Sequence, residues 1–173
     1  LMRGLAMDFP DDVKARDISD EFSFGPAFLV QPVTRPMYHV AEPPPATVPG
    51  DALHTLDGDP GIAVQYFEGR NFEKPAGSVV DPKVDYTWPG PPLAGPPPGL
   101  SGFDNFSARF EGTLTAPESG EYEIGLEGDD GYRLFLDGNK VVEVWGSGPK
   151  RYKGAKITLT KGQKLPVKIE YFQ

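Results

Sequence analysis

Apolar and polar residues alternate along most of the chain from Phe106 onward. Phe106, Ala108 and Phe110 share one face of a strand, because successive side chains in a strand point to opposite faces. The same alternation recurs over 122–126 and 165–171. Turn residues separate such segments at intervals of about 8–12 residues, which is typical of antiparallel sandwiches. The pattern therefore predicts a mainly β protein built on an antiparallel two-sheet β-sandwich.

One connection between strands carries a specific turn signal. The segment Asp137-Gly138-Asn139 is flanked by two predicted strands, 133–137 and 140–145. Asp-Gly pairs favour tight hairpins, because glycine adopts positive φ without steric cost. We expect an antiparallel hairpin at this point of the chain.

A proline-rich stretch interrupts the alternation between Asp81 and Gly99. It includes Trp88-Pro89-Gly90-Pro91-Pro92 and Pro96-Pro97-Pro98. Proline has no backbone N–H to donate to a neighbouring strand, so a central strand is excluded here. We expect an ordered surface loop or an extended, polyproline-like strap.

Composition divides the chain into three regions. Residues 1–38 are mixed, with one or two helical turns expected in 11–22 and a buried strand in 24–33. Residues 39–61 hold several prolines and few large apolar side chains, which predicts a semi-rigid linker. Residues 62–173 contain the alternating segments and form the predicted sandwich.

Charge and residue content narrow the function classes. The chain has 17 basic and 25 acidic side chains, a net charge of −8, so nucleic acid is not an expected partner. No apolar run approaches the ~18 residues of a membrane span, and no membrane partner is expected. The chain has no cysteine, which excludes disulfides, thiolate metal sites and cysteine nucleophiles.

The carboxy-terminal two-thirds carries a recognisable series of motifs. They are, in order, FSARFEG at 106–112, APESGEY at 116–122, GDDGYRLFLDG at 128–138 and KIEYF at 168–172. This series closely resembles the PA-14 module, a β-sandwich named after the 14-kDa portion of protective antigen. The resemblance covers about 62–173, with Trp88 in the place of the module's usual tryptophan. It implies a two-sheet sandwich of the kind inserted into glycosidases, adhesins and toxins, often one that binds sugars.

The amino-terminal piece carries a second series of motifs. LMRGLAMDFPDD at 1–12 and the segment 17–33 resemble glycoside hydrolase family 31, with Gly4 standing where that family usually has proline. The resemblance implies the end of a catalytic barrel and the start of its neighbouring β domain. It implies that the parent is a secreted or periplasmic α-glucosidase or α-xylosidase. Because the chain starts at Leu1 and that family's two catalytic carboxylates lie upstream, we expect an inactive fragment with no catalytic residues.

Adjacent aspartates give the sharpest candidate site. Asp129 and Asp130 follow a predicted strand, and carboxylates in a loop are suitable ligands for Ca²⁺, which takes six to eight oxygens. In adhesins that the sandwich resembles, two such aspartates hold a calcium ion that contacts sugar hydroxyls. The alternative is a structural turn in which one carboxylate accepts backbone N–H groups and the other pairs with Arg109 or Arg133. Calcium is thus the candidate cofactor.

Aromatic side chains are the other expected element of a sugar site, because the apolar face of a pyranose stacks on a ring. Trp88 is either a stacking platform or a plug that packs against the sandwich. Trp145 is expected to be half buried at the end of a strand. The candidates for carbohydrate contact are Tyr86, Trp88, Tyr132 and Trp145, together with Asp129 and Asp130, and Tyr152 is a further aromatic candidate.

Three functions compete. The leading one is a carbohydrate-binding accessory module of an α-glycosidase, whose partners are the rest of that enzyme and plant-polysaccharide oligosaccharides such as xyloglucan fragments. The second is a spacer that positions the catalytic barrel without binding a ligand. The third is a calcium-dependent, adhesin-like lectin domain.

Overall fold

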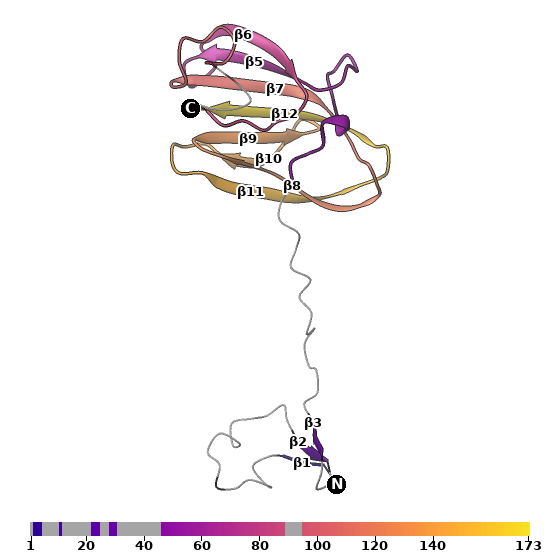
Figure 1. Cartoon of the computed structure of the whole chain (residues 1–173). Helices are drawn as coiled ribbons and strands as arrows, with labels where there is room; N and C mark the ends of the chain where they lie inside the picture. Colours follow the sequence, from indigo (N-terminus) through magenta and orange to yellow (C-terminus); the bar gives the residue numbers. More distant parts are fainter. Residues whose placement is uncertain (1, 5–10, 12–21, 25–27, 31–45, 89–94) are drawn as a thin grey trace. The chain divides into compact units, whose positions relative to one another are not determined.

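The computed structural model describes residues 2–4, 11, 22–24, 28–30, 46–88 and 95–173. These residues belong to two compact units, Leu1–Pro45 and Ala46–Gln173 (Figure 1). In the described parts of the chain, no helix is long and apolar enough to cross a membrane.

The first unit contains a small antiparallel sheet. Its strands are β1 (Met2–Gly4), β2 (Phe22–Phe24) and β3 (Phe28–Val30), in the order β1-β2-β3. The single strand expected over 24–33 is replaced by two strands that pair with each other, with Phe24 opposite Phe28. The helical turns expected in 11–22 fall almost entirely on residues outside the described ranges.

The second unit is an antiparallel β-sandwich, which confirms the predicted fold class (Figure 1). Its large sheet has seven strands in the order β10-β9-β12-β7-β5-β6, with β4 paired to β7, and its small sheet consists of β11 and β8. The strands are β4 (Leu53–His54), β5 (Ile62–Glu68), β6 (Lys74–Asp81), β7 (Phe106–Thr115), β8 (Gly120–Gly128), β9 (Gly131–Leu136), β10 (Asn139–Val144), β11 (Arg151–Leu159) and β12 (Lys164–Phe172).

The period-two alternation determines which side chains fill the interior. Phe106, Ala108 and Phe110 of β7 are buried in one core cluster, as their spacing predicted. The neighbouring strands contribute to the same cluster in register, because Ile169 of β12 lies opposite Phe110 and Leu134 of β9 lies opposite Ile169. This face of the large sheet is called the inner face below.

The small sheet and the proline-rich strap together cover the inner face. Partly buried side chains of β8 and β11, including Ile124 and Ile157, pack against the core cluster. Tyr86 and Trp88 of the strap, and Leu100 directly after it, pack against the same cluster, and residues 89–94 lie outside the described ranges. The described part of the strap is therefore part of the core and more than a surface loop.

The sandwich starts earlier than residue 62. A short 3-10 helix, η2 (Gly50–Ala52), leads into β4, where Leu53 pairs with Leu114 and His54 with Thr113 of β7. Leu53 is buried in the core cluster. The described part of the expected linker, from residue 46 onward, is thus built into the second unit.

Strand register brings several loops to one end of the large sheet. Glu68 at the end of β5 pairs with Phe106 at the start of β7, and Phe172 at the end of β12 pairs with Gly131 at the start of β9. The loops 69–73, 129–130 and 145–150 therefore lie at this end, called the aspartate end. The hairpin turn at Asp137-Gly138 lies at the opposite end, and its positive φ values of 49° and 77° confirm the predicted turn.

Candidate functional site

Asp129 and Asp130 form the turn between β8 and β9. The peptide bond that joins them is cis. The hydroxyl of Tyr171, near the end of strand β12, donates a hydrogen bond to the backbone carbonyl of Asp129. Asp129 as a residue is exposed, so its carboxylate lies at the surface of the aspartate end.

Asp130 connects two further loops to this turn. The Gly148 N–H donates to Asp130 Oδ1 at 2.9 Å, and Arg70 Nη2 lies 3.8 Å from Asp130 Oδ2. Arg70 Nη1 also donates to Ser147 Oγ at 3.2 Å. The side chain of Asp130 is only 16% exposed, so these contacts fix its orientation. Sequence reasoning missed Arg70 and Ser147, because neither belongs to a motif and only the folded register brings them to Asp130.

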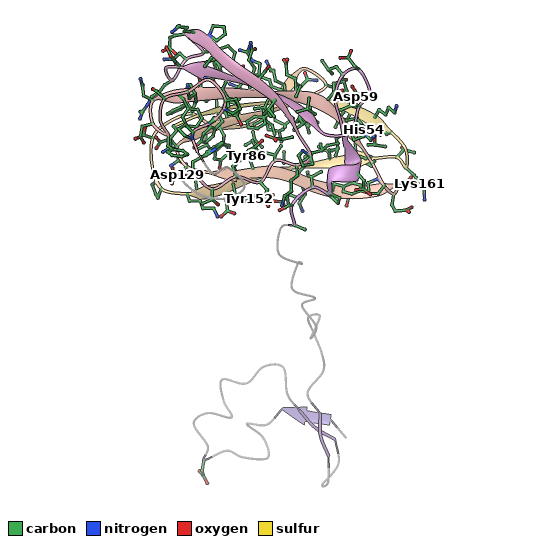
Figure 2. All side chains as sticks on the ribbon, turned by 45° about the horizontal axis from the view of Figure 1, so that its top comes forward. His54, Asp59, Tyr86, Asp129, Tyr152 and Lys161 are labelled. Carbon is green, nitrogen blue, oxygen red and sulfur yellow. The ribbon has the colours of Figure 1, made fainter. Side chains whose placement is uncertain are left out.

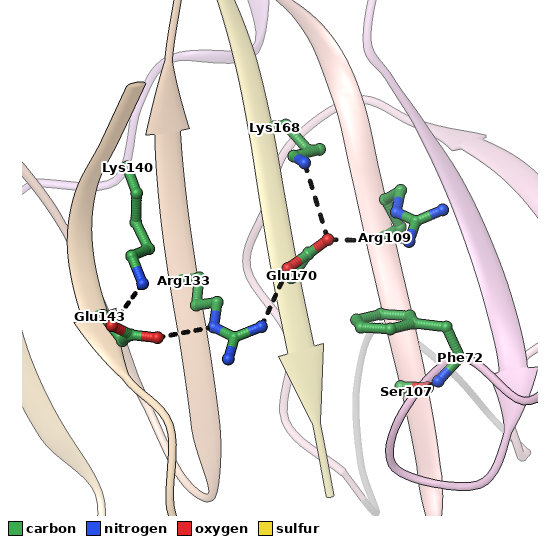
Figure 3. Close-up of polar contacts among 8 residues, drawn as sticks. All are labelled: Phe72, Ser107, Arg109, Arg133, Lys140, Glu143, Lys168 and Glu170. Carbon is green, nitrogen blue, oxygen red and sulfur yellow. Dashed lines mark hydrogen bonds and ion pairs between the residues drawn. The ribbon is translucent and has the colours of Figure 1, made fainter. Parts of the chain in front are cut away.

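The arginines expected to pair with the aspartates are used elsewhere. Arg109 Nη2 lies 3.7 Å from Glu170 Oε1, and Arg133 Nη1 lies 3.5 Å from Glu170 Oε2 (Figure 3). Lys168 Nζ lies 3.7 Å from the same carboxylate. The expectation of a pair with Arg109 or Arg133 is wrong, because alternation places both on the outer face of the large sheet beside Glu170. The other half of that alternative, a backbone N–H bound to one carboxylate, describes Asp130 correctly.

The surroundings of the aspartate pair determine how well it suits a calcium ion. Within the described ranges, no group of three or more Asp, Glu or His side chains is arranged to hold a metal ion. Asp130 already accepts a backbone N–H and faces the Arg70 guanidinium. Asn139 donates to the Asp137 carbonyl at the opposite end of β9, so it does not join the pair. As arranged, the pair fits a structural turn better than a calcium site, and calcium binding stays a prediction.

Three candidate aromatics are packed into the sandwich. Tyr132 is 2% exposed, and its hydroxyl donates to the Arg151 carbonyl at 2.6 Å. The Trp88 ring stacks on Tyr86 at 4.8 Å between centroids and lies 5.2 Å from the Tyr171 ring. Tyr86 donates a hydrogen bond to Asp81. Trp88 is thus a plug that packs against the inner face, one of the two roles considered for it.

Burial has an electrostatic consequence for these phenols. Loss of solvation raises the pKa of Tyr132, and it also raises the pKa of Tyr86 and of Tyr171. These side chains are therefore neutral hydrogen-bond donors at physiological pH.

Trp145 lies at the aspartate end but is covered by its neighbours. The Arg133 guanidinium carbon lies 3.7 Å from the ring centroid, and Phe172 packs edge-on at 4.8 Å. Phe72 of the loop 69–73 stacks at 6.2 Å. The half-buried position expected for Trp145 agrees with this packing.

Tyr152 differs from the other candidate aromatics. It is 40% exposed, and its hydroxyl donates to Glu123 Oε1 at 3.0 Å. Figure 2 labels Tyr152 together with Tyr86 and Asp129 in the second unit. Of the five aromatic candidates, only Tyr152 is an exposed residue, since Tyr132 is buried and Tyr86, Trp88 and Trp145 are half-buried.

Comparison with protein families places both parts of the chain. Residues 58–173 match the family model of the PA14 domain. Residues 1–54 match the family model described as the glycosyl hydrolase family 31 C-terminal domain.

The individual relatives are much larger proteins, and this chain matches only a small part of each. The anti-sigma-I factor RsgI3 of Acetivibrio thermocellus is 29% identical over 113 residues, 65% of this chain and 17% of its own length. A beta-glucosidase of Rhizobium radiobacter is 30% identical over 120 residues, 64% of this chain and 14% of its own length. The chain therefore spans less than a fifth of either curated relative.

Solved structures agree on the fold. An anti-sigma factor domain-containing protein superposes with a TM-score of 0.59 at 29% identity, over 65% of this chain and 38% of its own. A GH31 alpha-xylosidase from Xanthomonas citri gives a TM-score of 0.59 at 22% identity, over 69% of this chain and 13% of its own. At 22% identity, the likeness to this alpha-xylosidase shows a shared fold alone.

Proposed function

Because this chain belongs to the PA14 domain family over residues 58–173 and its residues 1–54 match the family 31 C-terminal domain, we propose that it is a carbohydrate-binding accessory module of an α-glycosidase. The parent enzyme is secreted or periplasmic and acts on plant oligosaccharides or polysaccharides, with α-xylosidase action on xyloglucan fragments as the leading case. The parent's barrel supplies the reactive carboxylates, and this chain supplies binding.

The observation that carries this proposal is the convergence of three loops at the aspartate end. The Asp130 carboxylate accepts a hydrogen bond from the Gly148 N–H and forms an ion pair with Arg70. Arg70 also donates a hydrogen bond to the Ser147 hydroxyl. A fixed set of carboxylate, guanidinium and hydroxyl groups suits sugar hydroxyls, which both donate and accept hydrogen bonds. Preorganised groups also lose little conformational entropy on binding. Asp129, the exposed residue next to this set, supplies the carboxylate that accepts a hydrogen bond from a sugar hydroxyl.

A glycan array and calorimetry with the whole chain test the proposal. We expect xyloglucan oligosaccharides to bind and Asp129→Asn to weaken binding about tenfold, since hydrogen bonds to a charged group contribute about 1.5–3 kcal/mol. The matched control is Asp137→Asn, the same change in an exposed turn at the opposite end of the sheet. Equal affinity of Asp129→Asn and wild type would place the sugar elsewhere.

The spacer function has one observation in its favour. Tyr132 is buried, and Trp88 is packed between Tyr86 and Tyr171, so two of the expected stacking rings are structural. Silence across the whole glycan array would favour this alternative. Hydrolysis of an aryl α-xyloside by the chain alone would contradict both readings.

The calcium-dependent lectin is the third function, and titration separates it from the others. If calcium joins the aspartates, calorimetry with Ca²⁺ alone shows heat that Asp129→Asn reduces, and sugar binding requires the ion. Sugar binding that persists in excess chelator removes this reading.

A further inference from the structure

Two glycines face each other in the middle of the small sheet. Gly125 of β8 pairs directly with Gly154 of β11, inside strands of nine residues each. Neither glycine has a positive φ, so backbone conformation does not require glycine at either position. Glycine inside a strand weakens it and marks a site where another group approaches closely.

The group that approaches is the Tyr152 side chain. A Cβ built on Gly154 would lie 2.4 Å from the Tyr152 hydroxyl oxygen. A Cβ built on Gly125 would lie 2.4 Å from the Lys153 carbonyl oxygen and 2.8 Å from the Tyr152 hydroxyl oxygen. Residues two apart in a strand share a face, so Tyr152 extends along β11 over Gly154. The phenol therefore occupies the space of a side chain at Gly154 and reaches across to Gly125, where the β11 backbone also leaves no room for a Cβ.

This arrangement fixes an exposed ring. Glu123 Oε1 accepts from the Tyr152 hydroxyl at 3.0 Å, which anchors the far end of the side chain. The near end is anchored by the backbone of β11, and 40% of the residue remains exposed. A ring held at both ends loses little rotamer freedom when a ligand covers it.

Polar side chains surround the ring on the same face. Glu127 lies opposite Tyr152 in the pairing of β11 with β8. Its Oε1 atom lies 3.3 Å from Nζ of Lys150, which is an ion pair. Lys156 lies opposite Glu123. These exposed groups accept and donate hydrogen bonds around a flat apolar ring. A pyranose is complementary to this arrangement, because its apolar face is surrounded by hydroxyl groups. The carboxylates of Glu123 and Glu127 disfavour an anionic sugar.

We propose that Tyr152, laid over the Gly125–Gly154 pair and flanked by Glu123 and Lys156, is a second saccharide platform, distinct from the aspartate end. Its ligand is a neutral pyranoside whose substituents are equatorial, such as the β-linked glucose or xylose units of a plant polysaccharide. Such rings present an apolar face of axial C–H groups to the phenol. The inference rests on the proposed carbohydrate-binding function and adds a second contact surface to it.

Calorimetry of the whole chain with cellohexaose and with xylohexaose tests the platform. We expect Tyr152→Ala to weaken binding of at least one of them about tenfold. Tyr152→Phe, which keeps the ring, is expected to stay within about threefold of wild type. Gly154→Ala removes no polar group but displaces the phenol, and it is expected to weaken binding as Tyr152→Ala does. Leu56→Ala, at a large apolar residue that is 68% exposed, is the matched surface control.

A second readout reports on stacking itself. Saturation-transfer NMR is expected to mark the axial protons of one sugar face in wild type and in Tyr152→Phe, and to lose this pattern in Tyr152→Ala. Oligogalacturonate, an anionic sugar, is expected not to bind. Unchanged affinity and an unchanged saturation pattern in Tyr152→Ala would overturn the platform.

The Asp129→Asn variant separates this inference from the proposed site. If Tyr152→Ala weakens binding and Asp129→Asn does not, the platform stands and the aspartate end fails. If Asp129→Asn abolishes binding and Tyr152→Ala leaves it intact, the aspartate end stands and the platform fails. If wild type binds no saccharide, both fail.

Discussion

The Arg133 guanidinium carbon lies 3.7 Å from the centroid of the Trp145 ring. The same side chain donates from Nε to Glu143 Oε1 at 3.0 Å and reaches Glu170 Oε2 at 3.5 Å (Figure 3). Arg133 therefore links β9, β10 and β12 across the outer face and covers one face of Trp145. A tryptophan covered in this way contributes to the fold and does not present that face to a sugar.

Removal of this arginine tests the link. We expect Arg133→Ala to lower the free energy of unfolding by about 1–3 kcal/mol, because it uncovers Trp145 and takes a cation from the buried Glu170. In a Trp88→Phe background, Trp145 is the sole tryptophan, and its quenching by acrylamide is expected to increase. Lys140→Ala, which removes a cation that pairs with Glu143, is the control. Equal quenching in both variants would contradict the arrangement.

Gly131 is a position where a methyl group cannot fit. A Cβ there would lie 2.0 Å from Cε1 of the Phe172 ring, and Phe172 is 6% exposed. We expect Gly131→Ala to cost about 1–3 kcal/mol by overpacking, measured by urea unfolding. Gly120→Ala serves as the control, because nothing lies within 4 Å of a Cβ at that position and its φ is not positive. Equal stability of the two variants would show that Phe172 moves aside freely.

Ser107 holds the loop 69–73 on the sheet. It is fully buried, its Oγ accepts from the Phe72 N–H at 2.9 Å, and it donates to the Gly69 carbonyl at 2.7 Å. We expect Ser107→Ala to cost about 1–3 kcal/mol, because both backbone groups lose their partner. Hydrogen exchange at the Phe72 amide is expected to speed up more than exchange in the core of β12. Unchanged exchange at Phe72 would contradict the role of Ser107.

Buried tyrosines make stability sensitive to alkaline pH. Burial raises the pKa of Tyr66 to about 12 from the usual 10, and it also raises the pKa of Tyr86 and Tyr171. A raised pKa means that the folded state favours the protonated phenol. The stabilisation is therefore complete below pH 10 and is lost as the pH rises from about 10 toward 12.

We expect cooperative unfolding in this range, followed by circular dichroism, with part of the tyrosine ionisation seen in ultraviolet absorbance occurring in the same step. Tyr66→Phe is expected to move the transition to higher pH, because one ionisable buried group is gone. Ionisation of every tyrosine near pH 10 without loss of structure would contradict the burial.

The outcome for the candidate site shows where sequence reasoning reaches its limit. The motif Gly128-Asp129-Asp130-Gly131 located the turn, and the structure surrounds it with Arg70, Ser147 and Gly148. Those partners come from two other loops, and no sequence spacing relates them to the aspartates. Arg133 is nearer in sequence than any of them, yet strand alternation directs both Arg133 and Arg109 to Glu170.

The amino-acid sequence by itself determined the fold class, the core faces of β7 and β12, and the hairpin turn at Gly138. These features follow from local rules, since side-chain alternation and positive φ depend on neighbours along the chain. The tertiary structure alone decided that Trp88 plugs the core, that Arg133 covers Trp145 and that Tyr152 lies exposed over two glycines. The physical reason is that burial and ion pairing depend on strand register and on the packing of loops, which bring together residues far apart in the chain.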